Sequence, residues 1–325
     1  MLERTSTSRR SALGRVLRSV VVSAISFAIA HSKKATPLLP LEPSQIKLDR
    51  VPLPRNACAF AFANGNAQNL SAAVERCHQE KVTLHGPISV LIALALAEAK
   101  RRSQGEGERG PIRMAVDVDY NLRGAVEPLL NRNEHVGLLI GIGTIKEFSE
   151  QGLELSGNFW DAARAAKAQT DATRTSLAFD LTMAVADNGL DTPEKNVRLF
   201  GNAEGGVISD VNILNIGRYP FPLEHTCMID SEGSTAAQHR RSVKVQEVHL
   251  VNSMPSVAPS MAAYFIATTR MHYAIAHKFE TELGCQMMQL VVATIESIGT
   301  IDAEETVGQG SHRVFDNFNA EAGRQ

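Results

Sequence analysis

The sequence has little of several residue types that mark particular classes of protein. Aromatic residues make up 5% of the chain, too few for the stacking platforms that bind nucleic acids or sugars. The 33 Lys and Arg residues against 35 Asp and Glu leave a formal net charge of -2, so neither a nucleic acid nor a membrane surface is indicated as a partner. No C-x-x-C spacing occurs, so neither a zinc site nor a disulfide framework is predicted from the four separated cysteines, Cys58, Cys77, Cys227 and Cys285.

Several kinds of binding and catalytic site are also excluded, because their sequence motifs are absent or incomplete. The segment Gly141-Ile-Gly143 lacks the third glycine of a dinucleotide-binding loop, and no G-x-S-x-G nucleophile elbow occurs in the chain. His225 and Cys227 have no further ligand at a recognised spacing. His272 and His277 are five residues apart, which places them on opposite faces of a strand. We therefore expect no metal site and no resident cofactor.

Asp117 and Asp119 share one face of a predicted strand. Two carboxylates so placed can serve acid/base chemistry. The alternative is a solvent-facing pair flanked by Arg113 and Arg123, and the sequence favours this second interpretation because isolated carboxylates are seldom buried.

The chain has room for substantial cores, since it holds 325 residues of which 44% are hydrophobic. We divide it into an N-terminal basic and apolar helix at 1–35, a proline-rich extended linker at 36–65, a main lobe at 66–300 and a polar, loose tail at 301–325. Residues 1–30 are rich in Arg, Ser and Thr and end in an apolar run, which leaves open a cleavable targeting peptide. The cysteine usage favours a cytoplasmic location, with an organellar or secretory one as the alternative if residues 1–30 are such a peptide.

The hydrophobic periodicity predicts an α/β fold, a mixed sheet flanked by helices. Helices are expected over 88–102, 158–174 and 280–298, each with apolar residues on one face. Strands are expected over 112–120, 136–145, 207–216, 242–253, 261–268 and 271–276. The strand at 207–216 should lie near the centre of the sheet, because it alternates apolar residues and carries few charges.

Four segments in a fixed order resemble the chloramphenicol acetyltransferase-like acyltransferases, above all alcohol O-acetyltransferases, polyketide-associated acyltransferases and condensation domains. The segments are VTLHGPISVLIALALA at 82–97, VDYNLR at 118–123, FWDAAR at 159–164 and ISDVNILNIGRYPF at 208–221. The resemblance runs from about Ser11 to Ile298 and implies the C-terminal lobe of a two-lobed fold, in which an acyl-thioester tunnel and an acceptor tunnel meet between the lobes.

The signature His-His-x-x-x-Asp-Gly, whose second histidine acts as the general base of that family, is absent from this chain. The one histidine with an aspartate four positions later is His312, followed by Asp316, and it lies past the last family helix. We therefore assign no catalytic residue. By resemblance, residues that shape or anchor the substrate tunnel are Arg123, Asp210, Asn215 and Gly217.

The resemblance implies transfer of an acyl group from acyl-CoA or an acyl carrier thioester, as co-substrate, to a small alcohol or amine. Because the histidine signature is missing, we expect a truncated chain that is inactive alone, with an exposed apolar face for a second lobe or a protein partner. The alternative is a non-catalytic binding or scaffold protein built on the same lobe.

Overall fold

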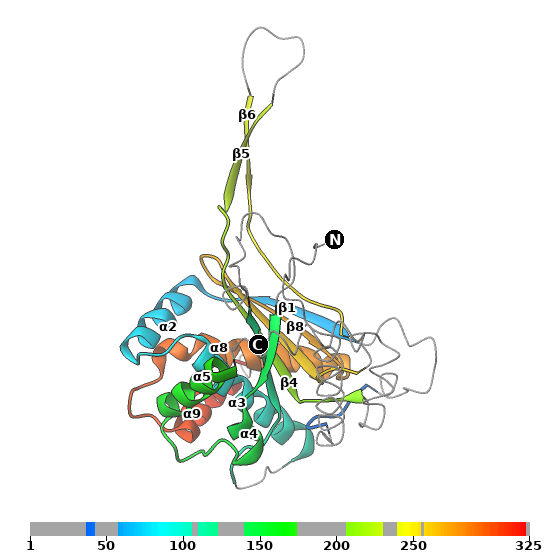
Figure 1. Cartoon of the computed structure of the whole chain (residues 1–325), viewed down its shortest axis with the longest axis vertical. Helices are drawn as coiled ribbons and strands as arrows, with labels where there is room; N and C mark the ends of the chain where they lie inside the picture. Colours follow the sequence, from blue (N-terminus) through cyan, green and yellow to red (C-terminus); the bar gives the residue numbers. More distant parts are fainter. Residues whose placement is uncertain are drawn as a thin grey trace, which may run out of the picture.

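The computed structural model describes residues 37–42, 58–105, 110–122, 140–173, 206–229, 239–254 and 257–322 (Figure 1). The expected N-terminal helix at 1–35, the targeting segment within it and Arg123 lie outside these residues. No helix in the described ranges has an apolar stretch long enough to cross a membrane.

A six-stranded mixed sheet forms the frame of the molecule. Its strands are β1 (Ala59–Asn64), β8 (Met271–His277), β7 (Met261–Ala267), β4 (Val211–Arg218), β2 (Val116–Asn121) and β3 (Ile140–Thr144), in that spatial order. Strand β4 runs parallel to both of its neighbours, whereas the other pairs are antiparallel. The prediction that the segment 207–216 supplies an interior strand is confirmed.

All described α-helices contribute to one apolar core on a single face of this sheet. They are α2 (Ala67–Gln79), α3 (His85–Gln104), α4 (Lys146–Glu150), α5 (Phe159–Thr173), α8 (Thr281–Glu296) and α9 (Val307–Ala322), with a 3-10 turn at Ile298–Thr300. We call this side of the sheet the helical face. The predicted helices at 88–102, 158–174 and 280–298 are confirmed as α3, α5 and α8.

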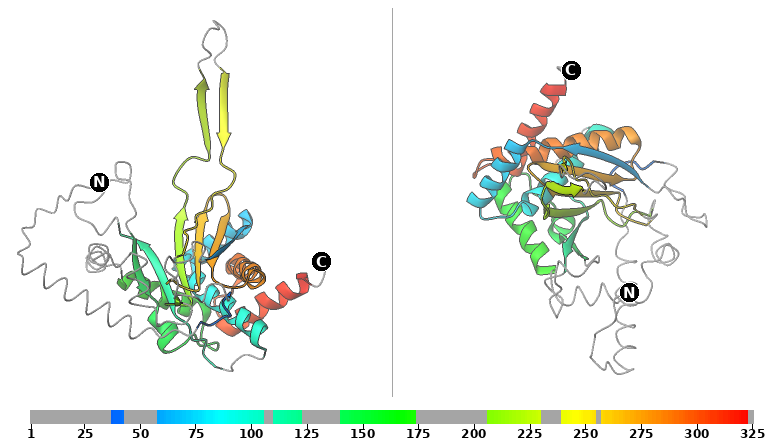
Figure 2. Two further views of the ribbon diagram at one scale, coloured as in Figure 1. Left: turned by 90° about the vertical axis from the view of Figure 1, so that its right-hand side faces the viewer. Right: turned by 90° about the horizontal axis from the view of Figure 1, so that it is seen from above.

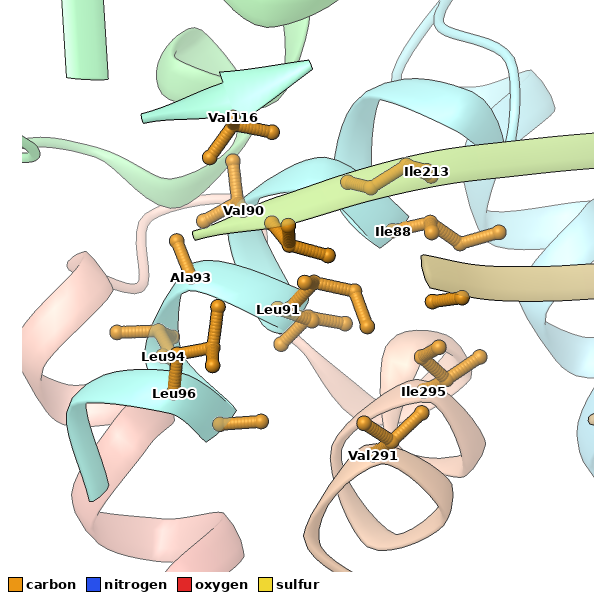
Figure 3. Close-up of a cluster of buried hydrophobic side chains, with 14 of the residues drawn as sticks. Ile88, Val90, Leu91, Ala93, Leu94, Leu96, Val116, Ile213, Val291 and Ile295 are labelled. Carbon is orange, nitrogen blue, oxygen red and sulfur yellow. The ribbon is translucent and has the colours of Figure 1, made fainter. Parts of the chain in front are cut away.

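Helix α3 is the centre of the core. Every residue from Gly86 to Leu96 is buried, and a helix that is apolar on all sides requires neighbours on all sides. Figure 3 shows its side chains between Val116 of β2 and Ile213 of β4 on one side and Val291 and Ile295 of α8 on the other. The helix becomes polar only in its last turns, where Glu98 pairs with Arg101 and Arg102.

The opposite side of the sheet, which we call the open face, has a thinner cover. Residues from the connection after β6 pack there in a second, smaller cluster, in which Met254 and Ala258 contact Ala262 and Tyr264 of β7. No helix among the described residues belongs to this cluster. The two faces follow from the two-residue period of the strands, since Val116 and Val118 of β2 pack on the helical face and Asp117 between them points to the open face.

A separate two-stranded ribbon leaves the body of the molecule after β4. It consists of β5 (Glu224–Ile229) and β6 (His239–Lys244), paired antiparallel. Both Figure 1 and the left view of Figure 2 show it standing clear of the sheet and helices. The strand expected over 242–253 therefore ends at Lys244, and the residues that follow form the cover of the open face instead.

Three further expectations are corrected by the element boundaries. Within the segment expected as a linker, residues 59–64 form the edge strand β1, because the sequence Ala-Phe-Ala-Phe-Ala-Asn alternates with a period of two. Within the tail expected to be loose, α9 buries Val307, Val314 and Phe315, which recur at helical spacing. In addition, the strand expected from residue 112 begins only at Val116, and Ile112 makes an isolated bridge with Leu153.

Candidate functional site

A cluster of carboxylate and amide side chains lies on the open face, across the three strands β3, β2 and β4. Thr144 Oγ1 donates a hydrogen bond to Asp117 Oδ1 at 2.6 Å, and Asn212 Nδ2 donates to Asp119 Oδ1 at 3.0 Å. The registers place Thr144 and Asn212 on either side of Asp117, on the same face of the sheet. We call Asp117, Asp119, Asn212 and Thr144 the acid–amide cluster.

The interpretation of Asp117 and Asp119 as a solvent-facing pair is wrong. Asp117 is only 4% exposed, and Asp119 is partly buried. Burial raises the pKa of Asp119 to about 6, against the hydrogen bond from Asn212, and the nearby charge of Asp117 adds to the increase. The position of Arg113 beside Asp117 and Asp119 in the sequence did not reveal that these carboxylates are buried, because burial depends on the residues that pack on the same face of the sheet.

The cluster has the composition of a polar ligand site. A carboxyl group with a pKa near 6 exchanges its proton close to neutral pH, so Asp119 can accept or donate a hydrogen bond to a hydroxyl or amine. The buried Oδ1 of Asn212 has no hydrogen-bond partner among the described residues. A buried acceptor without a partner costs free energy unless a ligand or water satisfies it. Together these two side chains offer one titratable acceptor and one unsatisfied acceptor at neighbouring positions.

Asp210 is the last residue before β4, and its carboxylate holds neighbouring backbone segments together through hydrogen bonds. Its Oδ2 accepts a hydrogen bond from the Ala115 amide at 2.8 Å, and its Oδ1 accepts one from the Leu38 amide at 3.2 Å. Burial raises the pKa of this carboxyl although the two amides act in the opposite direction. Both oxygens are thus engaged by the backbone, which ties β4 to the segment before β2.

Asn215 and Gly217 form a β-bulge at the other end of β4. The Gly217 amide donates to Asn215 Oδ1 at 3.1 Å, and the pairing with β7 shifts register between the two residues. Gly217 has φ of +81°, a left-handed conformation that favours glycine. The bulge lies where the chain turns from the sheet toward the ribbon, at the opposite end of β4 from Asp210. The structure therefore does not bring these three sequence-predicted residues into one site.

The histidines occupy separate places. His272 faces Asn64 and Thr268, with Nδ1 2.6 Å from Asn64 Oδ1 and Nε2 2.7 Å from Thr268 Oγ1. His277 lies against Gly284 of α8, on the helical face. The prediction that these two point to opposite faces is confirmed. His225 is exposed on β5, and no group of three metal-ligating side chains occurs among the residues that the structure describes.

His312 and Asp316, the pair with the family's four-residue spacing, lie on the exposed side of α9. Because α9 packs on the helical face, this pair is separated from the acid–amide cluster by the sheet. The sequence did not single out Asn212 and Thr144. The signal for Asn212 was an amide between the apolar residues Val211 and Ile213 of an interior strand, where a polar group needs a partner.

Two solved structures of the same fold were found by comparison of structures. One is a trichothecene 15-O-acetyltransferase from Fusarium sporotrichioides, with a TM-score of 0.55 and 10% identity over 89% of this chain and 54% of that one. The other is the epimerization domain from the third module of tyrocidine synthetase B, with a TM-score of 0.51 and 8% identity over 88% of this chain and 57% of that one. No protein-family model and no curated protein sequence matches.

The chain has the chloramphenicol acetyltransferase-like fold. The predicted α/β class, with a mixed sheet flanked by helices, is confirmed. The fold also agrees with the one that the sequence resemblance implies. The chain spans about half the length of the two structures that it matches. At 8–10% identity the likeness concerns the fold, and the activity has to be argued from the site.

Proposed function

We propose that this chain is an acyltransferase-type lobe that takes part in the transfer of an acyl group from a thioester to an alcohol or amine. The single observation that carries the proposal is the acid–amide cluster, a buried polar site on the open face of a sheet with an acyltransferase fold. The acyl donor is acyl-CoA or an acyl carrier thioester, and the acceptor is a small hydroxyl or amine compound.

In this proposal the acid–amide cluster holds the acceptor. The acceptor hydroxyl or amine donates a hydrogen bond to Asn212 Oδ1 or to Asp119, which satisfies the acceptor atom that the described residues leave without a partner. Attack on the thioester carbonyl forms the new C–O or C–N bond and breaks the C–S bond, and the acceptor's proton leaves with the thiol. The general base comes from outside this chain, because the chain lacks the histidine signature.

A second lobe or a protein partner is proposed to supply that base and to cover the open face. Large apolar side chains are exposed on this face, with Phe60 44%, Phe62 52% and Ile142 64% exposed. The ribbon β5–β6 adds support, because an isolated two-stranded ribbon is marginally stable in water and gains stability by packing. The chain alone is proposed to be inactive or nearly so.

The proposal is tested by thioester binding and thiol release with the full chain. Octanoyl-CoA is the binding probe, and release of free CoA with a panel of short alcohols and amines reports transfer. We expect saturable binding of octanoyl-CoA with transfer only slightly above the background rate. In the presence of an acceptor at saturating thioester, any residual transfer should rise as the pH passes through about 6 and should fall in Asp119→Asn and Asn212→Leu.

The control is Asp302→Asn, which removes the same charge from an exposed position on the helical side. A chain that binds no octanoyl-CoA and releases no thiol under any condition would contradict the proposal. The non-catalytic binding or scaffold protein would then be the better description. Fast transfer by the chain alone would contradict the need for a second lobe.

A further inference from the structure

A cavity of about 560 Å³ lies on the helical side of the molecule, between the end of α3, the segment 110–113 and helix α9. It is separate from the acid–amide cluster, which lies on the open face. Its volume falls within the range of roughly 300–1,000 Å³ that is usual for small-molecule sites. The apolar part of its wall comes from Leu94 of α3, Ile112 and Phe315 of α9.

The charged side chains in the cavity wall differ in whether they pair with a neighbour of opposite charge. Glu98 is 6% exposed and accepts hydrogen bonds from Arg101 and Arg102, so its charge is neutralised within α3 itself. Lys100 and Arg113 also line the cavity. The charge of Lys100 acts on the buried carboxylate of Asp210, which is held by two backbone amides, whereas Arg113 is exposed. The remaining carboxylate of the wall is Asp316 of α9, an exposed side chain. The cavity thus presents two cations, Lys100 and Arg113, beside an apolar wall, and the carboxylate nearest to Arg101 and Arg102 is already engaged by them.

We propose that this cavity binds a small amphipathic carboxylate. Its carboxylate is held by Lys100 and Arg113, and its hydrocarbon part lies against Leu94, Ile112 and Phe315. Arginine and carboxylate groups form charge-assisted hydrogen bonds, which are about twice as strong as neutral ones. The apolar wall contributes by removal of hydrocarbon surface from water. The inference is independent of the proposed acyl transfer, because it rests on other residues on the other side of the sheet.

Octanoate is the probe, and its binding to the full chain is measured by isothermal titration calorimetry. We expect saturable binding of octanoate, with weaker binding of octanol, which lacks the charge, and of inorganic phosphate, which lacks the chain. Arg113→Gln should weaken octanoate binding by about ten-fold or more, the effect expected for a hydrogen bond to a charged group. Ala97→Phe places a ring in the cavity and should abolish binding.

The matched control is Arg218→Gln, which removes the same charge from an exposed residue at the far end of β4 and should leave the affinity unchanged. Far-UV circular dichroism of each variant checks its fold, and if Ala97→Phe does not fold, Arg113→Gln decides the matter. Equal binding of octanol or of phosphate would overturn the proposal. It would also be overturned by the absence of saturable octanoate binding, or by the same affinity in Arg113→Gln and Arg218→Gln.

Discussion

Asp119 is a carboxyl group that the fold makes costly to ionise. Its pKa of about 6 in the folded chain lies above its ordinary value of 3.8. The folded state therefore holds its proton more tightly than the unfolded state does. This contribution to stability is fully present below pH 3.8 and is lost as the pH rises through about 6. At neutral pH the native chain thus carries a buried charge that destabilises it.

We expect Asp119→Asn to raise the free energy of unfolding at pH 7 by about 3 kcal/mol, since the pKa rises from 3.8 to about 6 and each pKa unit corresponds to about 1.4 kcal/mol. The amide oxygen of the variant can still accept the hydrogen bond from Asn212. Urea unfolding at pH 4 and pH 7 measures the effect, which should be small at the lower pH. A variant that is less stable than the native chain at pH 7 would show that the ionised carboxylate is well compensated.

Gly217 is a second residue whose backbone conformation has a measurable consequence. Its φ of +81° is strained for any residue with a side chain, although a Cβ there would meet no atom within 4 Å. Gly217→Ala should therefore lower the free energy of unfolding by about 1–2 kcal/mol through backbone strain alone. Gly110→Ala is the control in thermal unfolding, because that position is equally open but has no positive φ. Equal effects of the two changes would contradict the argument.

The residues of the candidate site could be predicted from the sequence only in part. The two-residue period correctly placed Asp117 and Asp119 on one face of β2. Their burial could not be predicted, because it depends on strands β3 and β4, which lie 21 or more residues away in the chain. The role of Asp210 in shaping the tunnel, selected by resemblance, stays a prediction. The structure shows that its oxygens accept hydrogen bonds from two backbone amides.

Among the elements, α9 shows how a helix with a polar composition can be missed. The helix begins with a reciprocal cap, in which the Gln309 amide donates to Thr306 Oγ1 at 3.2 Å and the Thr306 amide donates to Gln309 Oε1 at 2.9 Å. This Thr-x-x-Gln pattern was present in the sequence. The long apolar helices and the strands at 207–216, 261–268 and 271–276 were predictable because their periodicity is strong.

We expect α9 to be needed for the stability of the lobe. Phe315 is 6% exposed, and Phe315→Ala should lower the free energy of unfolding by about 3 kcal/mol, the usual cost of emptying an aromatic site in a core. Asn317→Ala on the exposed side of the same helix should change it by no more than about 0.5 kcal/mol. Urea unfolding of both variants measures the difference. A native-like Phe315→Ala would mean that α9 detaches without loss, as a loose tail would.

At the scale of the whole molecule, the two faces of the sheet differ in how they are finished. The helical face carries six helices and a continuous core, whereas the open face carries one connection and the acid–amide cluster, among the residues that the structure describes. The order of predicted helices and strands indicated a mixed sheet, but it could not give the spatial order of the strands. In that order β4 pairs with β2 and β7, which are distant from it in the sequence. That order depends on long-range pairing.

The open face leads to a prediction for the isolated chain. Its two edge strands expose Phe60 on β1 and Ile142 on β3, and exposed apolar side chains on an edge strand favour pairing with another chain. A net charge of only -2 offers little repulsion against such contacts. We therefore expect the isolated chain to associate as its concentration rises in sedimentation velocity runs.

The double change Phe60→Glu and Ile142→Glu should keep it monomeric, because each carboxylate would have to be buried in the contact. The control Val74→Glu adds a charge at an exposed position of α2, on the helical side, and should leave the association unchanged. If the native chain stays monomeric at every concentration, or if Val74→Glu dissociates it as well as the double change does, the exposed edge strands are not a surface at which this chain associates.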